Sequence, residues 1–146
     1  MLREIFPEWR YASPASRAAI ARAEATLGIQ FPSELAALYL ETDGVRESLG
    51  NAAYLLPLHA EVGDSLVSLT TFYWSEGAEY WPQLEFSRFV FFGSSSGDHA
   101  WGINWQQPGQ VIAFHHNMED AYVDIGTSIL DVYRKDFDWL KTRAGA

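Results

Sequence analysis

Three consecutive segments with strand character, late in the chain, constrain the fold more than any other feature of the sequence. The segment "RFVFF" (88–92) is a continuous apolar run typical of a buried strand. In "HAWGINW" (99–105), His99, Trp101, Ile103 and Trp105 alternate onto one face. The Pro-Gly pair in "QQPGQ" (106–110) predicts a turn, so "QVIAFHH" (110–116) is expected to return as the antiparallel partner. The sequence therefore predicts an antiparallel meander.

Helical patterns flank this meander. The first helix is expected to begin at Ser13 and Pro14, where serine caps and proline fits the first turn, and to end at Gly28. A second helix is expected from Pro32 to the "TDG" stop at 42–44, and a third after Ser128. Their predicted buried faces are Ile20, Ala23 and Leu27; Leu35, Leu38 and Tyr39; and Ile129, Val132, Tyr133, Phe137 and Leu140.

The middle of the chain carries mixed signals. The segment "AYLLPL" (53–58) suggests a short strand. The segment "GDSLVSLTTFYWSEG" (63–77) mixes β-branched, aromatic and helical residues, and we expect a helix there. Because the chain has 146 residues and no visible linker or repeat, we expect one domain over 1–146.

Composition excludes several function classes. Ten Lys and Arg against nineteen Asp and Glu give a formal net charge of −9, which disfavours direct binding to nucleic acids or anionic lipids and attracts cationic proteins. The chain has no cysteine, so it forms neither disulfides nor thiolate metal sites. Neither a signal peptide nor an apolar run long enough to span a membrane is visible, so the expected location is the cytoplasm. The oligomeric state is not predicted.

A catalytic motif needs separate consideration. Gly93, Ser95 and Gly97 spell G-x-S-x-G, the pattern that holds a nucleophilic serine between a strand and a helix in α/β-hydrolases. Here the pattern is followed by Asp98 and an alternating strand instead of a helix, so no helix N-terminus is available to stabilise an oxyanion. The sequence therefore favours a hairpin loop of small residues over a serine hydrolase.

Metal binding has little support. Adjacent residues of a strand point to opposite faces, so only one of His115 and His116 can join His99. A site made by His99, His115 and a carboxylate stays open as an alternative if their strands pair. Phosphate-binding glycine loops and the H-E-x-x-H zinc motif are absent from the sequence, and we expect neither a metal nor a cofactor.

The segment "FYWSEGAEYWPQLEF" (72–86) combines aromatic rings with carboxylates. Rings supply contact area and cation–π attraction while acids steer a basic partner, so this segment is a candidate binding edge. The alternative is that Trp74, Tyr80 and Trp81 complete the core, whereas Glu76 and Glu79 must face solvent. The candidate protein-binding residues are Glu76, Glu79, Tyr80, Trp81, Glu119 and Asp120.

Three stretches resemble the signatures of the SUKH superfamily in order and spacing. They are "LGIQFPSELAALYLETDGV" (27–45), "FVFFGSSSGDHAWGINW" (89–105) and "GQVIAFHHNMEDAYVDIGTSILDVYRKDFDWL" (109–140). The resemblance implies an α+β domain, in which a twisted antiparallel sheet is packed by N-terminal helices and a C-terminal helix, with a binding role and no catalytic set. It also implies that Gly97 and Asp98 belong to a hairpin element.

Two functions follow from this resemblance. Bacterial SUKH proteins are commonly cytoplasmic immunity proteins that neutralise polymorphic toxins, often nucleases, and an acidic chain suits a basic toxin domain. Eukaryotic relatives act as regulatory scaffolds in cell-wall synthesis. We therefore expect a non-catalytic immunity protein with a protein partner, and keep a scaffold module without a toxin partner as the alternative.

Overall fold

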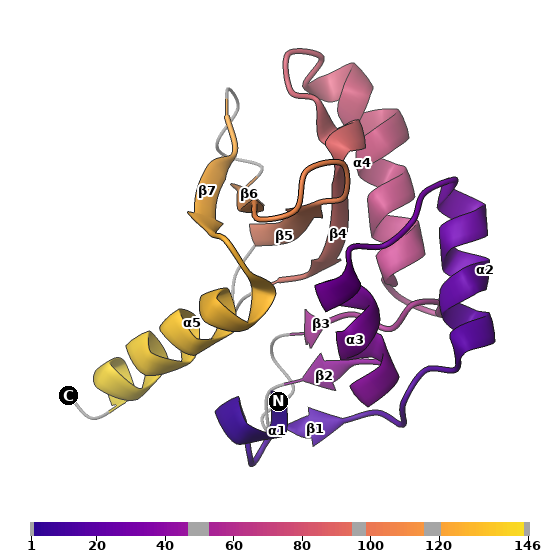
Figure 1. Ribbon diagram of the computed structural model, residues 1–146. Coiled ribbons are helices and arrows are strands. Elements are labelled where there is room, and N and C mark those ends of the chain that lie inside the picture. Colours follow the sequence, from indigo (N-terminus) through magenta and orange to yellow (C-terminus); the bar gives the residue numbers. More distant parts are fainter. Residues whose placement is uncertain (1, 47–52, 95–98, 116–120, 145–146) are drawn as a thin grey trace.

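The computed structural model describes residues 2–46, 53–94, 99–115 and 121–144. Within them the fold is α+β, with helices and two antiparallel sheets (Figure 1). The helices are α1 (Leu2–Ile5), α2 (Arg17–Leu27), α3 (Ser33–Glu41), α4 (Leu66–Tyr80), the 3-10 turn η1 (Phe86–Arg88) and α5 (Ile129–Ala144). The strands are β1 (Arg10–Tyr11), β2 (Val45–Arg46), β3 (Ala53–Leu55), β4 (Phe89–Gly93), β5 (His99–Asn104), β6 (Val111–His115) and β7 (Val123–Gly126).

The predicted meander is confirmed and is larger than expected. Strands β4, β5 and β6 pair antiparallel, with Val90 opposite Ile103 and Trp101 opposite Ala113. Strand β7 adds a fourth member, which gives the order β4-β5-β6-β7. A second sheet, of order β1-β2-β3, was not predicted beyond the strand at β3.

The predicted helices are confirmed, but the start of α2 was placed too early. The helix begins at Arg17, and the hydroxyl of Ser16 caps it by accepting a hydrogen bond from the backbone N–H of Ala19 at 3.0 Å. The backbone at Ser13 lies outside the helix, and its carbonyl accepts a hydrogen bond from the N–H of Asp43 at 2.8 Å. The expected end at Gly28 is confirmed, with a left-handed φ of 72°.

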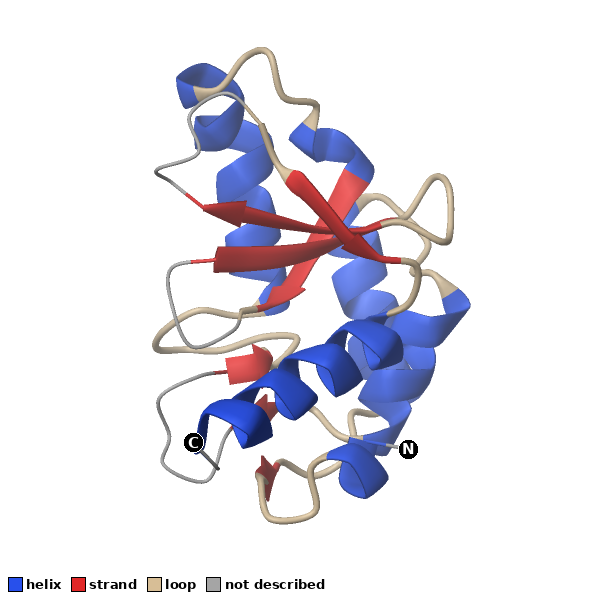
Figure 2. Cartoon of the chain, turned by 90° about the vertical axis from the view of Figure 1, so that its left-hand side faces the viewer, coloured by secondary structure: helices blue, strands red, loops and turns tan. Residues whose placement is uncertain are grey.

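Strand β4 separates two hydrophobic cores. Val90 and Phe92 face the first core, which includes Leu2, Ile20, Leu38, Tyr54, Trp101, Ile129 and Tyr133. Phe89 and Phe91 face the second core, which consists of Tyr73, Phe86, Phe89, Phe91, Ala100, Ile112 and Phe114. Figure 2 shows α4 lying behind the four-stranded sheet and α5 below it.

The two sheets meet where β3 approaches the end of β4. The backbone N–H of Leu56 donates to the carbonyl of Phe92 at 2.8 Å, and the N–H of Ser94 donates to the carbonyl of Ala53 at 3.0 Å. Gly93 lies between these bonds, and a Cβ atom added there would lie 1.9 Å from the carbonyl oxygen of Tyr54. The first glycine of the G-x-S-x-G pattern is therefore a site of close backbone approach.

Two buried tyrosines tie α5 to this junction. The hydroxyl of Tyr133 donates to the carbonyl of Tyr54, and the hydroxyl of Tyr54 donates to the carboxylate of Asp136. Both rings are completely buried, and their centroids lie 5.7 Å apart in an edge-to-face arrangement. The hydroxyl of Tyr133 thus satisfies a buried backbone carbonyl, and the hydroxyl of Tyr54 satisfies a half-buried carboxylate.

Asp136 makes the stability of the contact between α5 and the two sheets depend on pH. Burial raises the pKa of the Asp136 carboxyl above 3.8, and the hydrogen bond from Tyr54 opposes that rise in part. The folded protein therefore holds the Asp136 proton more tightly than the unfolded chain does, and this contribution to stability is lost as pH rises from about 3.8 through the folded pKa.

We expect Asp136→Asn to remove this contribution, because asparagine stays neutral and keeps an acceptor for Tyr54. The free energy of unfolding, measured in urea from pH 4 to pH 7, should fall less with rising pH in the variant than in the wild type. Glu61→Gln, at an exposed position, is the control and should leave the profile unchanged. Parallel profiles for the wild type and Asp136→Asn would contradict the prediction.

Candidate protein-binding surface

Helix α4 starts at a complete capping box. The hydroxyl of Ser65 accepts a hydrogen bond from the N–H of Ser68 at 3.0 Å, and the hydroxyl of Ser68 accepts one from the N–H of Ser65 at 2.8 Å. The buried residues then follow at helical spacing, at Leu66, Thr70, Tyr73 and Gly77. Local sequence therefore fixes both where the helix starts and which face it buries.

Hydrogen bonds connect this buried face of α4 to the backbone of β4. The backbone N–H of Phe91 donates to the hydroxyl of Thr70 at 2.9 Å, and the indole N–H of Trp74 donates to the carbonyl of Phe89 at 2.8 Å. The centroid of the Tyr73 ring lies 4.3 Å from that of Phe91, and the two rings are tilted by 33° to each other. These bonds cross the second core, so α4 is held against the sheet by directional contacts as well as by apolar burial.

The C-terminal end of α4 presents the predicted acids to solvent. Glu76 and Glu79 are exposed, and Tyr80 keeps 69% of its surface accessible. Trp81 instead is partly buried, with its ring 4.8 Å from that of Phe114, so it supports the second core as the alternative interpretation expected. The other two candidates, Glu119 and Asp120, lie outside the described residues.

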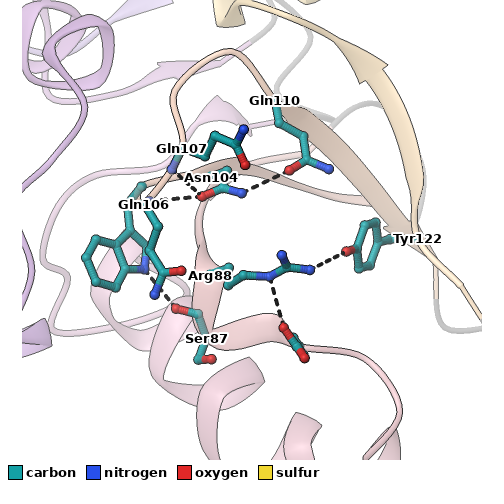
Figure 3. Close-up of polar contacts among 9 residues, drawn as sticks. Ser87, Arg88, Asn104, Gln106, Gln107, Gln110 and Tyr122 are labelled. Carbon is teal, nitrogen blue, oxygen red and sulfur yellow. Dashed lines mark hydrogen bonds and ion pairs between the residues drawn. The ribbon is translucent and has the colours of Figure 1, made fainter.

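A pocket of about 240 Å³ adjoins this end of the helix. Its lining is mainly polar and consists of Gln83, Leu84, Glu85, Arg88, Ala121 and Tyr122. In Figure 3 the guanidinium of Arg88 points toward the hydroxyl of Tyr122, at 3.4 Å. Its Nε lies 3.2 Å from a carboxylate oxygen of Glu85, which is the distance of an ion pair although the atoms are not aligned for a hydrogen bond.

Sequence reasoning did not identify this pocket. The one local signal was Glu85 three residues before Arg88, a spacing that brings opposite charges together on a helical turn. Tyr122 joins them from the segment before β7, and its ring lies 5.0 Å from that of Phe89. The register of a sheet is needed to bring these segments together.

A buried asparagine shapes the neighbouring turn between β5 and β6. The side-chain oxygen of Asn104 accepts hydrogen bonds from the N–H groups of Gln106 and Gln107 at 2.9 and 2.8 Å (Figure 3). Its amide nitrogen donates to Gln110 at 2.9 Å, and Gln110 donates to Asp124 of β7 at 2.9 Å. This chain of bonds connects the predicted Pro-Gly turn to the edge strand.

The surroundings of the G-x-S-x-G pattern differ from those of a nucleophile elbow. Ser95, Gly97 and Asp98 lie outside the described residues, but the chain resumes at His99 as strand β5, which pairs antiparallel with β4. The element after the pattern is therefore a strand, as the sequence analysis expected, and not the helix that an elbow requires.

The strand pairing that a histidine site would need is present. His99 and His115 are direct partners on β5 and β6. Within the described part of the chain, however, no group of three or more His, Cys, Asp or Glu side chains is placed to hold a metal ion. His59 lies elsewhere, with its Nε2 3.4 Å from Nε of Arg22.

Comparisons with known proteins place the chain in a family. Among the residues described, no helix is both long enough and apolar enough to cross a membrane. No curated protein matches the chain in a sequence search. A comparison with protein families, in contrast, matches residues 14–135 to the SMI1 / KNR4 family (SUKH-1), a stretch that runs from before α2 into α5 and includes both sheets apart from β1. The chain belongs to the SMI1 / KNR4 family (SUKH-1).

Proposed function

We propose that this chain is a non-catalytic immunity protein that binds and neutralises a basic toxin domain in the cytoplasm. The observation that carries the proposal is the C-terminal end of α4, where Glu76, Glu79 and Tyr80 are exposed on a helix whose opposite face is locked to β4. Family membership supports a role in protein–protein interaction.

The charge and rigidity of this surface suit such a partner. A domain that cleaves nucleic acid must present cationic residues, so a protein of net charge −9 is steered toward it at long range. The aromatic ring of Tyr80 offers contact area and a face for Arg or Lys of the partner. Because α4 is already fixed, little conformational entropy is lost when it binds.

The alternative function is a regulatory scaffold of the same fold. The two functions differ in affinity, because an immunity protein must hold one partner at nanomolar dissociation constants or tighter, whereas a scaffold tolerates about micromolar ones. The deciding experiment is a pull-down from the native host at low and high salt, with mass spectrometry of what co-purifies. One stoichiometric basic partner that is toxic without this chain supports immunity. Several weak, non-toxic, salt-labile partners would support the scaffold.

Charge reversal tests the surface itself. We expect Glu76→Lys/Glu79→Lys to weaken binding of the captured partner at least about tenfold, through slower association and loss of local ion pairs. The matched control is Glu8→Lys/Glu61→Lys, which changes the net charge equally at exposed positions away from this surface. Association and dissociation rates by surface plasmon resonance measure both variants. An equal loss in the two would mean that overall charge, and not this surface, determines binding.

A further inference from the structure

A second pocket lies beside the small sheet, far from the C-terminal end of α4. Figures 1 and 2 place β1 and β2 at the opposite end of the molecule from that helix end. The pocket has a volume of about 270 Å³, and its lining includes Arg10, Asp43, Val45, Arg46, Leu55 and Pro57.

The pocket brings two arginines together, and neither forms an ion pair with a described acid. Arg10 and Arg46 are direct partners on β1 and β2, so their side chains leave the same face of the sheet. Both side chains are exposed, and neither guanidinium group has a hydrogen-bond or ion-pair partner among the described residues. Like charges directly opposite each other on neighbouring strands destabilise a sheet. Their pairing here is notable because the chain has nearly twice as many acids as bases.

Two other arginines of the described residues lie within ion-pair distance of an acid. Arg88 lies 3.2 Å from Glu85, and Arg134 lies 3.5 Å from Asp131. Arg10 and Arg46 have no such neighbour within 4 Å among the described residues, so no described group occupies the N–H donors of their guanidinium groups. Two adjacent guanidinium groups form the donor arrangement that binds an oxyanion through several parallel hydrogen bonds.

The rest of the lining limits which oxyanion fits. Pro57 is partly exposed and gives the pocket an apolar component, whereas Val45 and Leu55 border the pocket but bury their side chains in the first core. Asp43 contributes a negative charge, and one of its carboxylate oxygens already accepts a hydrogen bond from the N–H of Leu58 at 2.9 Å. Two arginines and one aspartate leave a single net positive charge in the pocket. This balance favours a monoanion joined to an apolar group over a doubly charged phosphate.

We propose that this pocket binds an acidic peptide segment of a protein partner, with a carboxylate between Arg10 and Arg46 and an adjacent aliphatic side chain against Pro57. The ligand relieves the repulsion between the two arginines. This site is independent of the surface on α4, because the two share no residue and lie at opposite ends of the fold. A partner bound at α4 therefore leaves the pocket accessible.

The test is a titration of the ¹⁵N-labelled protein followed by NMR. The probe is the blocked tripeptide acetyl-Leu-Glu-Leu-amide, and acetyl-Leu-Gln-Leu-amide and inorganic phosphate are the comparison ligands. We expect saturable shifts of the amide signals of Tyr11, Gly44 and Arg46, with the glutamine peptide bound at least about tenfold more weakly. Saturation by the glutamate peptide alone supports the proposal.

A double variant connects the shifts to the arginines. Arg10→Gln/Arg46→Gln should weaken binding of the glutamate peptide at least about tenfold, without loss of folded signals, because it removes a like-charge pair. Arg17→Gln/Arg22→Gln removes the same charge from the exposed face of α2 and should bind as the wild type does. The proposal is overturned if no saturation occurs by about 10 mM peptide, if phosphate binds more tightly than the peptide, or if both double variants lose affinity equally. None of these outcomes bears on the toxin partner, whose binding is tested at α4.

Discussion

Replacing Gly93 with alanine is expected to lower the free energy of unfolding by more than about 3 kcal/mol. The added Cβ would lie 1.9 Å from the carbonyl oxygen of Tyr54, far inside van der Waals contact. Both groups belong to backbone that is held by hydrogen bonds between β3 and β4, so neither can yield without breaking the junction of the two sheets. Urea unfolding followed by tryptophan fluorescence measures the loss.

A second glycine separates this steric effect from backbone strain. Gly93 does not have a positive φ, so the alanine penalty there comes from the contact with Tyr54. Gly63 has a φ of 85° and open space around its Cβ position, so Gly63→Ala should destabilise the fold by only about 1–2 kcal/mol through backbone strain. Equal losses at the two positions would refute the close approach of β3 to Gly93.

Tyr133→Ala is expected to lower the free energy of unfolding by about 3–5 kcal/mol. The ring is completely buried in the first core, with the rings of Phe6, Tyr54 and Trp101 at centroid distances of 5.7, 5.7 and 5.8 Å. Removing it leaves a cavity where α5 meets both sheets, and the carbonyl of Tyr54 loses the hydroxyl that donates to it. Thermal and urea unfolding provide the measurement.

Tyr133→Phe separates the contribution of ring packing from that of the hydrogen bond to the carbonyl of Tyr54. The ring contacts remain in this variant, so the loss should fall to about 1–3 kcal/mol, the penalty for leaving a buried acceptor without its donor. If Tyr133→Phe were as destabilising as Tyr133→Ala, the stabilisation would come from the hydrogen bond and the ring packing would be incidental. If Tyr133→Phe were neutral, another donor would have to satisfy the carbonyl of Tyr54.

Much of the fold was predictable because its elements carry strong local signals. The alternation in β5 and the Pro-Gly turn before β6 predicted the meander, and buried faces at helical spacing predicted α2, α3 and α5. Strands β1 and β2 have two residues each, too few for any periodicity, and only their tertiary pairing with each other defines them as strands. A two-residue strand has no signature in the sequence.

The exposure of the candidate binding residues was predictable from the sequence only for those that lie on one helix, α4. Carboxylates among aromatic residues placed Glu76 and Glu79 on the exposed side of α4, as the structure has them. The pocket containing Arg88 and Tyr122 was not predicted, because separate segments form it through sheet register. The need for glycine at position 93 is not visible in the local sequence, since strand β3, which approaches Gly93 closely, lies far away along the chain.

Strand β4 divides the interior into two compartments, and this division bears on how the molecule can evolve. Helix α4 buries Tyr73 against Phe86, Phe91 and Phe114, and none of these residues belongs to the compartment that holds α1, α3 and α5. Substitutions on opposite sides of β4 share few neighbours, so their effects on stability should add. Selection for a new partner can therefore remodel the end of α4 while the remainder of the scaffold keeps its packing.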